Sequence, residues 1–160
     1  MKLYHGSTQI VSMPKIIIGG HFLDFGYGFY TTTNKEQAVR WAGIKKNRTK
    51  SQNAYLNIYE IDDNAFNLFS ARLFENPNRE WLEFVIGNRQ GTITHNYDYV
   101  RGPVANDTLY QTFALYEAGV LTVEETVARL KVHELFDQIS FHTEKMLEEL
   151  HFLEIIDLGK

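Results

Sequence analysis

The sequence contains no cysteine, which excludes a disulfide scaffold, a thiolate nucleophile and a cysteine-ligated metal site. It also lacks an apolar run of membrane-spanning length, and its N-terminus lacks the basic and apolar stretches of a secretory signal. We therefore expect a cytoplasmic protein with no membrane partner. The formal net charge of −4 argues against broad electrostatic attraction to nucleic acid, but it leaves room for a local basic patch.

Prolines are also few, three in all, and no linker, repeat or low-complexity segment divides the chain. A length of 160 residues fits one compact domain, so we expect a single domain over residues 1–160. Apolar spacing predicts helices at 34–47, 78–88, 107–119, 122–136 and 144–152, and strands at 3–7, 29–33, 54–62, 96–104 and 137–143. Because these elements do not alternate strictly, the order favours an α+β fold with a split or mixed sheet.

Several local signals refine these elements. Asn34 with Gln37, and Thr122 with Glu125, have the spacing of a capping box at a helix start. Gly87-Asn88 is expected to end the helix at 78–88, and Thr143 to cap the last helix. Residues 45–50, "KKNRTK", are expected to form a solvated loop after the first helix; the alternative is recognition of a phosphate-bearing or acidic target. Three large aromatic residues are expected in the core: Trp41, Trp81 and Phe84.

Aromatic residues are frequent, at 14%, and one glycine-rich stretch places a tyrosine in a special position. In "DFGYGFYTTT", residues 24–33, Gly26 and Gly28 precede Tyr30. The stretch is neither a dinucleotide-binding fingerprint nor a P-loop, because it has no third glycine and no Gly-Lys-Ser/Thr. The spacing allows close backbone approach to a flat ligand, with the Tyr30 face suited to a planar and preferably cationic ring.

Two separated stretches carry a resemblance to a known superfamily. "LYHGS" (3–7) and "DFGYGFYTTTNKEQAVRWA" (24–42) are similar to the first two signature blocks of the ADP-ribosyltransferases, in the diphtheria-toxin and poly(ADP-ribose) polymerase-like branch. The whole chain also resembles a bacterial domain-of-unknown-function family of that superfamily, associated with toxin–antitoxin and defence modules. That likeness lies in "YDYVRGPVANDT" (97–108) and "QISFHTEKML" (138–147).

The resemblance implies an ADP-ribosyltransferase-like split sheet and roles for individual residues. His5 would bind the adenosine ribose of NAD, Gly6 would hold the nicotinamide carboxamide through its backbone, and Tyr30 would stack on the nicotinamide. Ser7 would support the first strand or touch the ribose, and Gly28 would allow close ligand approach. A Gly6→Val protein is then expected to fold without binding NAD.

The third signature element of the superfamily is a glutamate at the start of a late strand. Gln138 stands at the matching position, so an amide replaces the carboxylate that would stabilise positive charge on the ribose. We expect reduced turnover and no chain elongation from this departure. Glu144, Asp98 and Asp107 are candidates to supply the missing charge, and spacing does not choose among them.

The resemblance therefore implies an NAD-dependent mono-ADP-ribosyltransferase whose acceptor is a protein or nucleic acid, with a small antitoxin as a plausible partner. The alternatives are a weakly active or inactive module that binds NAD or ADP-ribose, and an interaction protein that uses residues 106–136. Five histidines show no metal-binding spacing, so we expect no metal: His21, His95, His133, His142 and His151.

Overall fold

The computed structural model describes residues 1–18, 23–104, 107–130 and 136–159, with the backbone alone for 107–110. These residues form an α+β fold with two separate sheets, five α-helices and one short 3₁₀ helix. The predicted fold class is therefore confirmed at this level. Of the predicted helix at 122–136, residues 131–135, including His133, lie outside the described part of the chain, as does His21.

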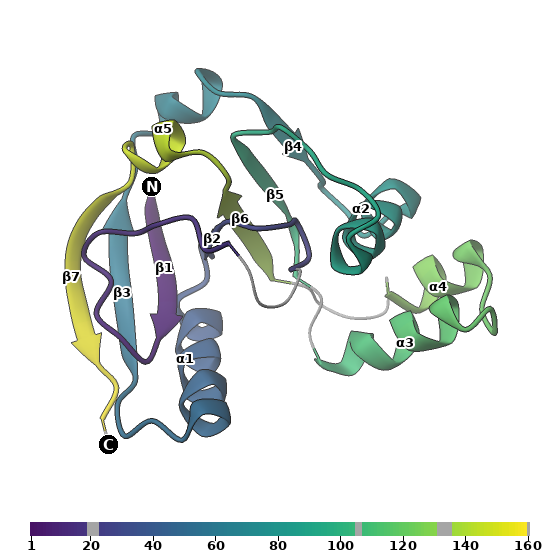
Figure 1. Cartoon of the computed structure of the whole chain (residues 1–160), viewed down its shortest axis with the longest axis horizontal. Coiled ribbons are helices and arrows are strands. Elements are labelled where there is room, and N and C mark those ends of the chain that lie inside the picture. Colours follow the sequence, from purple (N-terminus) through teal and green to yellow (C-terminus); the bar gives the residue numbers. More distant parts are fainter. Residues whose placement is uncertain (19–22, 105–106, 131–135, 160) are drawn as a thin grey trace.

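The first sheet has three antiparallel strands in the order β1-β3-β7. They are β1 (Lys2–Ser7), β3 (Tyr55–Glu60) and β7 (His151–Asp157). Helix α1 (Lys35–Thr49) lies along β1 and β3 (Figure 1). Its predicted start is confirmed, because the Asn34 side chain accepts a hydrogen bond from the Gln37 N–H at 2.8 Å.

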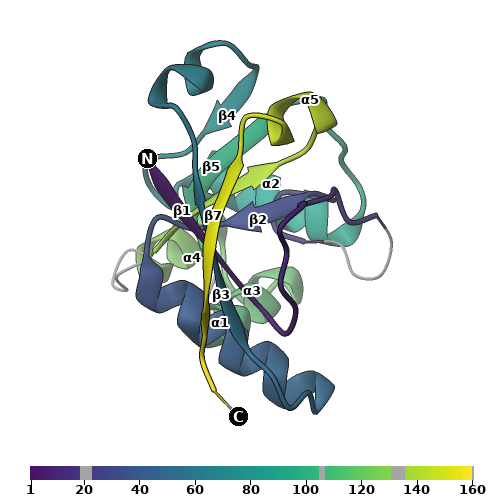
Figure 2. The same cartoon turned by 90° about the vertical axis from the view of Figure 1, so that its left-hand side faces the viewer.

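The second sheet has four strands in the order β2-β6-β5-β4, antiparallel except for the β4–β5 pair. They are β2 (Phe29–Thr31), β4 (Ala71–Leu73), β5 (Tyr99–Pro103) and β6 (Asp137–Phe141). The two sheets meet where Tyr4 and Thr32 exchange backbone hydrogen bonds of 2.9 and 3.0 Å. Figure 2 shows the strands of the two sheets crossing rather than running side by side.

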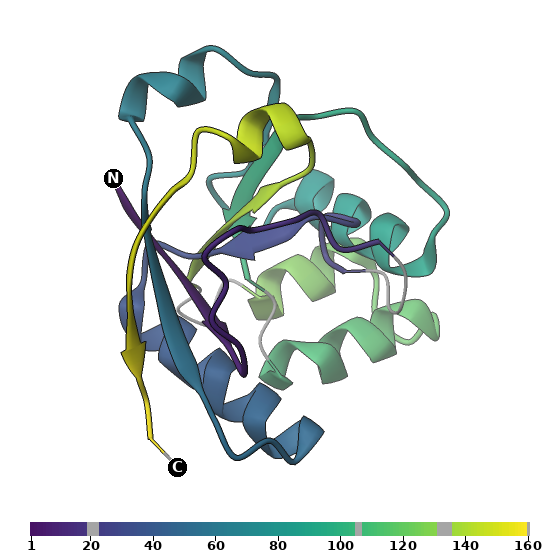
Figure 3. The same ribbon diagram turned by 60° about the vertical axis from the view of Figure 1, so that its left-hand side comes forward.

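The remaining helices are η1 (Asp63–Asn67), α2 (Arg79–Gln90), α3 (Asp107–Glu117), α4 (Val123–Leu130) and α5 (Glu144–Leu147). Helices α2, α3 and α4 gather beside the second sheet, on the side away from the first (Figure 1). Helices α3 and α4 lie next to each other (Figure 3). The capping box at α4 is present, with Thr122 and Glu125 bonded reciprocally at 3.3 and 3.1 Å.

Two apolar clusters make up most of the core. One joins both sheets to α5 and includes Leu3, Tyr59 and Phe141. The other lies under α2, α3 and α4 around the fully buried Trp81, which confirms the prediction for that residue. The first cluster fixes β1 against β2 and β6. These three strands carry all the residues predicted for the site except Gly28, which immediately precedes β2.

Two predicted helix ends are wrong. Helix α2 runs through Gly87 and Asn88 to Gln90, and Gly91 caps it with a φ of 72°, which suits glycine. A Cβ at Gly87 would lie 2.7 Å from Ile93, so this glycine serves close packing instead. The helix predicted over 144–152 ends at Leu147, and His151 begins β7, a strand that the sequence analysis missed.

No helix in the described ranges is both long and apolar enough to cross a membrane.

Candidate functional site

A pocket of about 220 Å³ brings together residues from several separate stretches of the chain. His5 comes from β1, Tyr30 from β2 and Gln138 from β6, so three of the predicted site residues share one cavity. The lining residues are His5, Leu23, Asp24, Tyr30, Trp41, Lys45, Val104 and Gln138. The other five were not among the predicted site residues: Leu23, Asp24, Trp41, Lys45 and Val104.

His5 is buried and held in one orientation. Its ring packs on Phe29 with centroids 4.4 Å apart, and its Nδ1 lies 2.7 Å from the backbone oxygen of Tyr30. Because a carbonyl oxygen only accepts, Nδ1 carries the proton and Nε2 is left as an acceptor. Burial, and then the charge of Lys45, lowers the pKa of His5 to about 3. At neutral pH the pocket therefore contains an uncharged, fixed hydrogen-bond acceptor.

Tyr30 is fixed through its hydroxyl to the loop that precedes it. The hydroxyl donates to the Gly26 oxygen at 2.6 Å and accepts from the Phe25 N–H at 2.9 Å. The Phe25 ring lies roughly parallel to the Tyr30 ring, with centroids 6.4 Å apart. Burial, followed by the charge of Asp24, raises the pKa of Tyr30 well above its usual value. The Tyr30 side chain is therefore neutral and fixed, and its ring lines one side of the pocket.

Gln138 is buried, and its Nε2 donates to Oδ2 of Asp24 at 3.2 Å. The other oxygen of Asp24, Oδ1, lies 4.0 Å from Nε of Arg89. The Asp24 side chain is 12% exposed, and the residue lines the pocket. Because the Gln138 amide nitrogen is turned to Asp24, its Oε1 is the acceptor that this side chain can offer to another group.

Lys45 adds a cation to the pocket. It lies in α1, which continues to Thr49, so the prediction of a loop at 45–50 is wrong for most of that segment. Its Nζ donates to the Gly6 oxygen at 2.9 Å. Burial, with a smaller contribution from Arg48, lowers the pKa of Lys45 to about 8. Trp41 lies one helical turn earlier and is half-buried on the pocket, not in the core as predicted.

The other predicted ligand contacts do not line this pocket. A Cβ at Gly6 would overlap the carbonyl oxygen of Ala38 and lie 2.7 Å from the Ala42 nitrogen, so Gly6 lets α1 pack on β1. A Cβ at Gly28 would lie 2.6 Å from the Phe141 oxygen. Ser7 accepts from the Gln9 N–H at 3.2 Å. Ligand contacts at these three residues stay predictions.

The steric role of Gly6 also changes one expectation. A valine there would collide with the backbone of α1, so a folded Gly6→Val protein is no longer expected. The Gly6 oxygen already accepts from Nζ of Lys45, so a ligand contact there would be shared with that lysine. Tyr4 exchanges its N–H and C=O with Thr32, and by strand alternation those of Gly6 face the same edge of β1.

Two of the three carboxylates proposed to compensate for Gln138 lie at the opposite end of β6. Burial alone would raise the pKa of Asp98, but hydrogen bonds from Ser70 and, at 2.8 Å, from the Thr143 hydroxyl together outweigh it and lower that pKa. Glu144 follows β6 on α5 and is exposed. The side chain of Asp107 lies outside the described residues. Neither Asp98 nor Glu144 lines the pocket, whereas Asp24 does.

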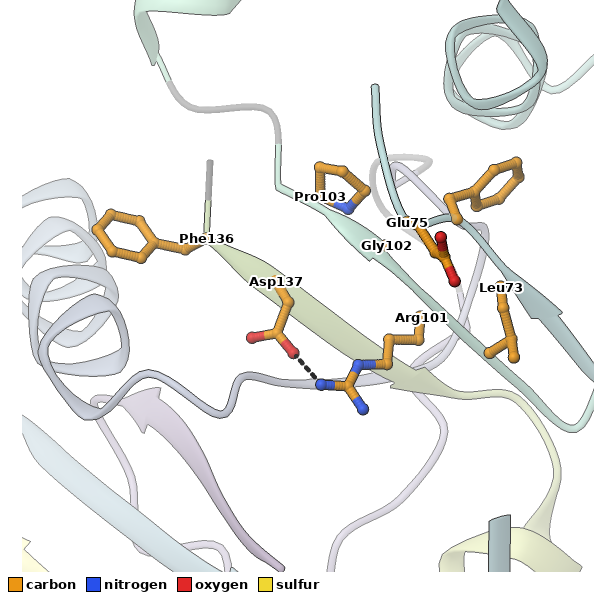
Figure 4. Close-up of a pocket in the computed structure, with 8 residues that line it drawn as sticks. Leu73, Glu75, Arg101, Gly102, Pro103, Phe136 and Asp137 are labelled. Atoms are coloured by element: carbon orange, nitrogen blue, oxygen red, sulfur yellow. Dashed lines mark ion pairs between the residues drawn. The ribbon is translucent and has the colours of Figure 1, made fainter. Parts of the chain in front are cut away.

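A larger cavity of about 450 Å³ lies beside β4, β5 and the start of β6, and Figure 4 shows its lining. There Nη2 of Arg101 pairs with Oδ2 of Asp137 at 3.1 Å. Asp137 also accepts from the Thr33 hydroxyl at 2.5 Å, and its backbone oxygen accepts from the Thr32 hydroxyl at 2.8 Å. Because Asp137 and Gln138 are consecutive on a strand, their side chains point to opposite faces. This network therefore anchors Gln138 from the face away from the pocket.

Two histidines hold the loop that carries Asp24. Nε2 of His95 lies 2.7 Å from the Phe25 oxygen, and Nδ1 of His142 lies 2.7 Å from the Tyr27 oxygen. Burial lowers the pKa of His142 to about 4. Both histidines therefore have hydrogen-bond partners in the fold. Among the described residues, no three His, Asp or Glu side chains form a group that could hold a metal ion.

Comparison with known proteins gives one match. A search of curated proteins and a search of solved structures each found none. A family model described as "Protein of unknown function (DUF3990)" matches residues 1–152, nearly the whole chain. The matched range contains α1, the pocket-lining residues from His5 to Gln138, and both sheets except for most of β7. On this match, the chain belongs to the DUF3990 family of proteins of unknown function.

Proposed function

We propose that this protein is an NAD-dependent mono-ADP-ribosyltransferase. The observation that carries the proposal is the meeting of His5, Tyr30 and Gln138 in one pocket. These residues come from three stretches that resemble the three signature elements of ADP-ribosyltransferases, and they are up to 133 positions apart in the sequence, from 5 to 138. The division of the strands into two sheets agrees with the split sheet that the resemblance implies.

The chemistry of the pocket suits the nicotinamide end of NAD. The Tyr30 ring offers a flat face to a cationic ring, which is the form of nicotinamide in NAD. The neutral Nε2 of His5 accepts from a ribose hydroxyl, and Lys45 offers a positive charge to the diphosphate. The volume of about 220 Å³ is below the roughly 300–1,000 Å³ of sites for whole drug-sized ligands, so only part of NAD is enclosed.

The proposed reaction breaks the bond between nicotinamide N1 and ribose C1′. The bonding electron pair leaves with nicotinamide, which becomes neutral, and positive charge develops on the ribose as in glycoside hydrolysis. A nucleophilic acceptor group then bonds to C1′ and loses its proton to solvent. With water as the acceptor, the products are ADP-ribose, nicotinamide and a proton.

The biological setting follows from the resemblance alone. We propose a bacterial toxin or defence effector that modifies a protein or nucleic acid in the cytoplasm, with an antitoxin-like partner. Transfer of a single ADP-ribose is favoured because Gln138 lacks the carboxylate that chain elongation requires in the similar enzymes. The same glutamine is what favours the second candidate, a weakly active module that binds NAD or ADP-ribose.

The test uses NAD labelled in its adenosine half, incubated with the protein and a bacterial lysate. Nicotinamide release and label in macromolecules are both measured, and NAD binding is followed by calorimetry. Tyr30→Ala is expected to weaken NAD binding by about 1–3 kcal/mol through loss of the stacking face. Tyr27→Ala removes an aromatic ring from the same loop but outside the pocket, and should leave binding unchanged.

Each outcome separates the candidates. Release and transfer by the wild type, with a selective loss in Tyr30→Ala, support the transferase. Binding without release supports the NAD-binding module. A folded wild-type protein that does not bind NAD would contradict both and favour an interaction protein.

A further inference from the structure

Asp24 places a carboxylate directly beside Gln138 in the pocket. Its Oδ2 accepts from the Gln138 amide at 3.2 Å, so its negative charge lies one hydrogen bond away from the residue that replaces the signature glutamate. Both side chains are largely shielded from water, and both line the same cavity as Tyr30. A charge in such a shielded site acts more strongly on its neighbours than one at the surface.

The loop around Asp24 is built to keep this carboxylate in place. Phe25, the next residue, has its N–H bonded to the Tyr30 hydroxyl at 2.9 Å and its oxygen 2.7 Å from Nε2 of His95. The Gly26 N–H donates to the Leu23 oxygen at 3.0 Å, which closes a tight turn over Asp24. Arg89 faces the other carboxylate oxygen at 4.0 Å. Electrostatic stabilisation of a transition state depends on groups that are fixed before the reaction begins.

From this geometry we propose that the Asp24 carboxylate stabilises the positive charge that develops on the ribose, and that Gln138 is held by Asp24 to present Oε1 to the ribose hydroxyl. The inference rests on the proposed transferase function. In this proposal two residues share the role of the signature glutamate. The Gln138 amide supplies the hydrogen bond, and Asp24 supplies the negative charge. The nicotinamide still leaves with the electron pair of the broken bond, so no proton donor is required.

The main test is Asp24→Asn, which keeps the size of the side chain and an oxygen for Gln138 but removes the charge. Nicotinamide release at saturating NAD should fall about 100-fold, the size of loss seen when one preorganised electrostatic contact is removed from an active site. NAD affinity should change by much less, because the charge is needed mainly as the bond breaks. Glu144→Gln removes an exposed carboxylate beyond the far end of β6 and should behave as the wild type.

A second pair of variants tests where the charge must be. Gln138→Glu alone would put two carboxylates about 3.2 Å apart, and one of them would then hold a proton at neutral pH, so no gain in rate is expected. Asp24→Asn combined with Gln138→Glu moves the single carboxylate to the strand and should recover at least 10-fold of the lost rate. A residue with only a structural role would not be rescued in this way.

The outcomes distinguish a failure of the role given to Asp24 from a failure of the proposed transferase function. If the wild type releases no nicotinamide, the transferase proposal fails before Asp24 is tested. If the wild type is active and Asp24→Asn matches it within about 3-fold, or loses only NAD affinity, the role given to Asp24 is wrong while the function stands. Should Asp24→Asn not fold, the double variant decides, and a folded but inactive double variant also overturns the role of Asp24.

Discussion

His5 should make the protein sensitive to mild acid. In the unfolded chain a histidine has a pKa of about 6.5. In the fold, burial and Lys45 lower the pKa of His5 to about 3. Between these values the unfolded chain binds a proton that the folded protein does not, so the free energy of unfolding falls as the pH falls. The stabilising contribution of neutral His5 is complete above pH 6.5 and is lost progressively below it.

The size of the effect follows from the two pKa values. One proton bound only by the unfolded chain changes the free energy of unfolding by about 1.4 kcal/mol per pH unit. From pH 7.5 to 4.5, His5 alone should account for a loss of about 2.5 kcal/mol. His142, with a pKa lowered to about 4, acts in the same direction.

Urea unfolding at pH 7.5, 6.5, 5.5 and 4.5 should be compared for the wild type and His5→Gln. Glutamine does not titrate and retains an N–H for the Tyr30 oxygen, so the variant should be less stable at pH 7.5 but lose less stability on acidification. The difference between the two slopes isolates His5, because His142 and the carboxylates titrate in both proteins. Parallel loss of stability in the two proteins would refute the buried, neutral state of His5.

Two further predictions concern α1. Gly6→Ala should lower the thermal midpoint in a circular dichroism melt, because its Cβ would overlap the Ala38 carbonyl, and overpacking of this kind costs about 1–3 kcal/mol; an unchanged midpoint would contradict the close packing of α1 on β1. NAD affinity, measured by calorimetry, should fall as the pH rises above about 8, where Lys45 loses its proton. Lys45→Met should bind NAD more weakly at pH 7 and show no such fall, and a persisting fall would assign it to another group.

The parts of the fold that could be predicted are those set by neighbours in sequence. Asn34 caps α1, and Thr122 and Glu125 cap α4, because these bonds join residues three apart. The segment from His151 to Asp157 was assigned partly to a helix because its identity as a strand depends on pairing with β3, almost a hundred residues earlier. Gly87 was interpreted as a helix end because glycine often ends helices. Its close packing against Ile93 becomes visible only in the folded structure.

The same difference between local sequence signals and long-range contacts applies to the candidate site. His5, Tyr30 and Gln138 were predicted because each stands in a recognisable stretch, and the fold brings them together. Asp24 opens the stretch that led to Tyr30, but its proximity to Gln138 arises from a loop and a strand that are 114 residues apart. Trp41 was assigned to the core because helical spacing alone does not tell which side of α1 meets a cavity. Lys45 was assigned to a solvated loop, whereas α1 continues past it to Thr49.

The packing of Gly6 against α1 has a consequence for changes in the length of the chain. His5 and Gly6 are adjacent, so their Cβ positions lie on opposite faces of β1. The His5 side chain faces the pocket, and the Cβ position of Gly6 faces α1. Inserting or deleting one residue in β1 would exchange these faces, placing an imidazole against the α1 backbone and a hydrogen in the pocket. Length variation should therefore not be tolerated within the six residues of the first strand.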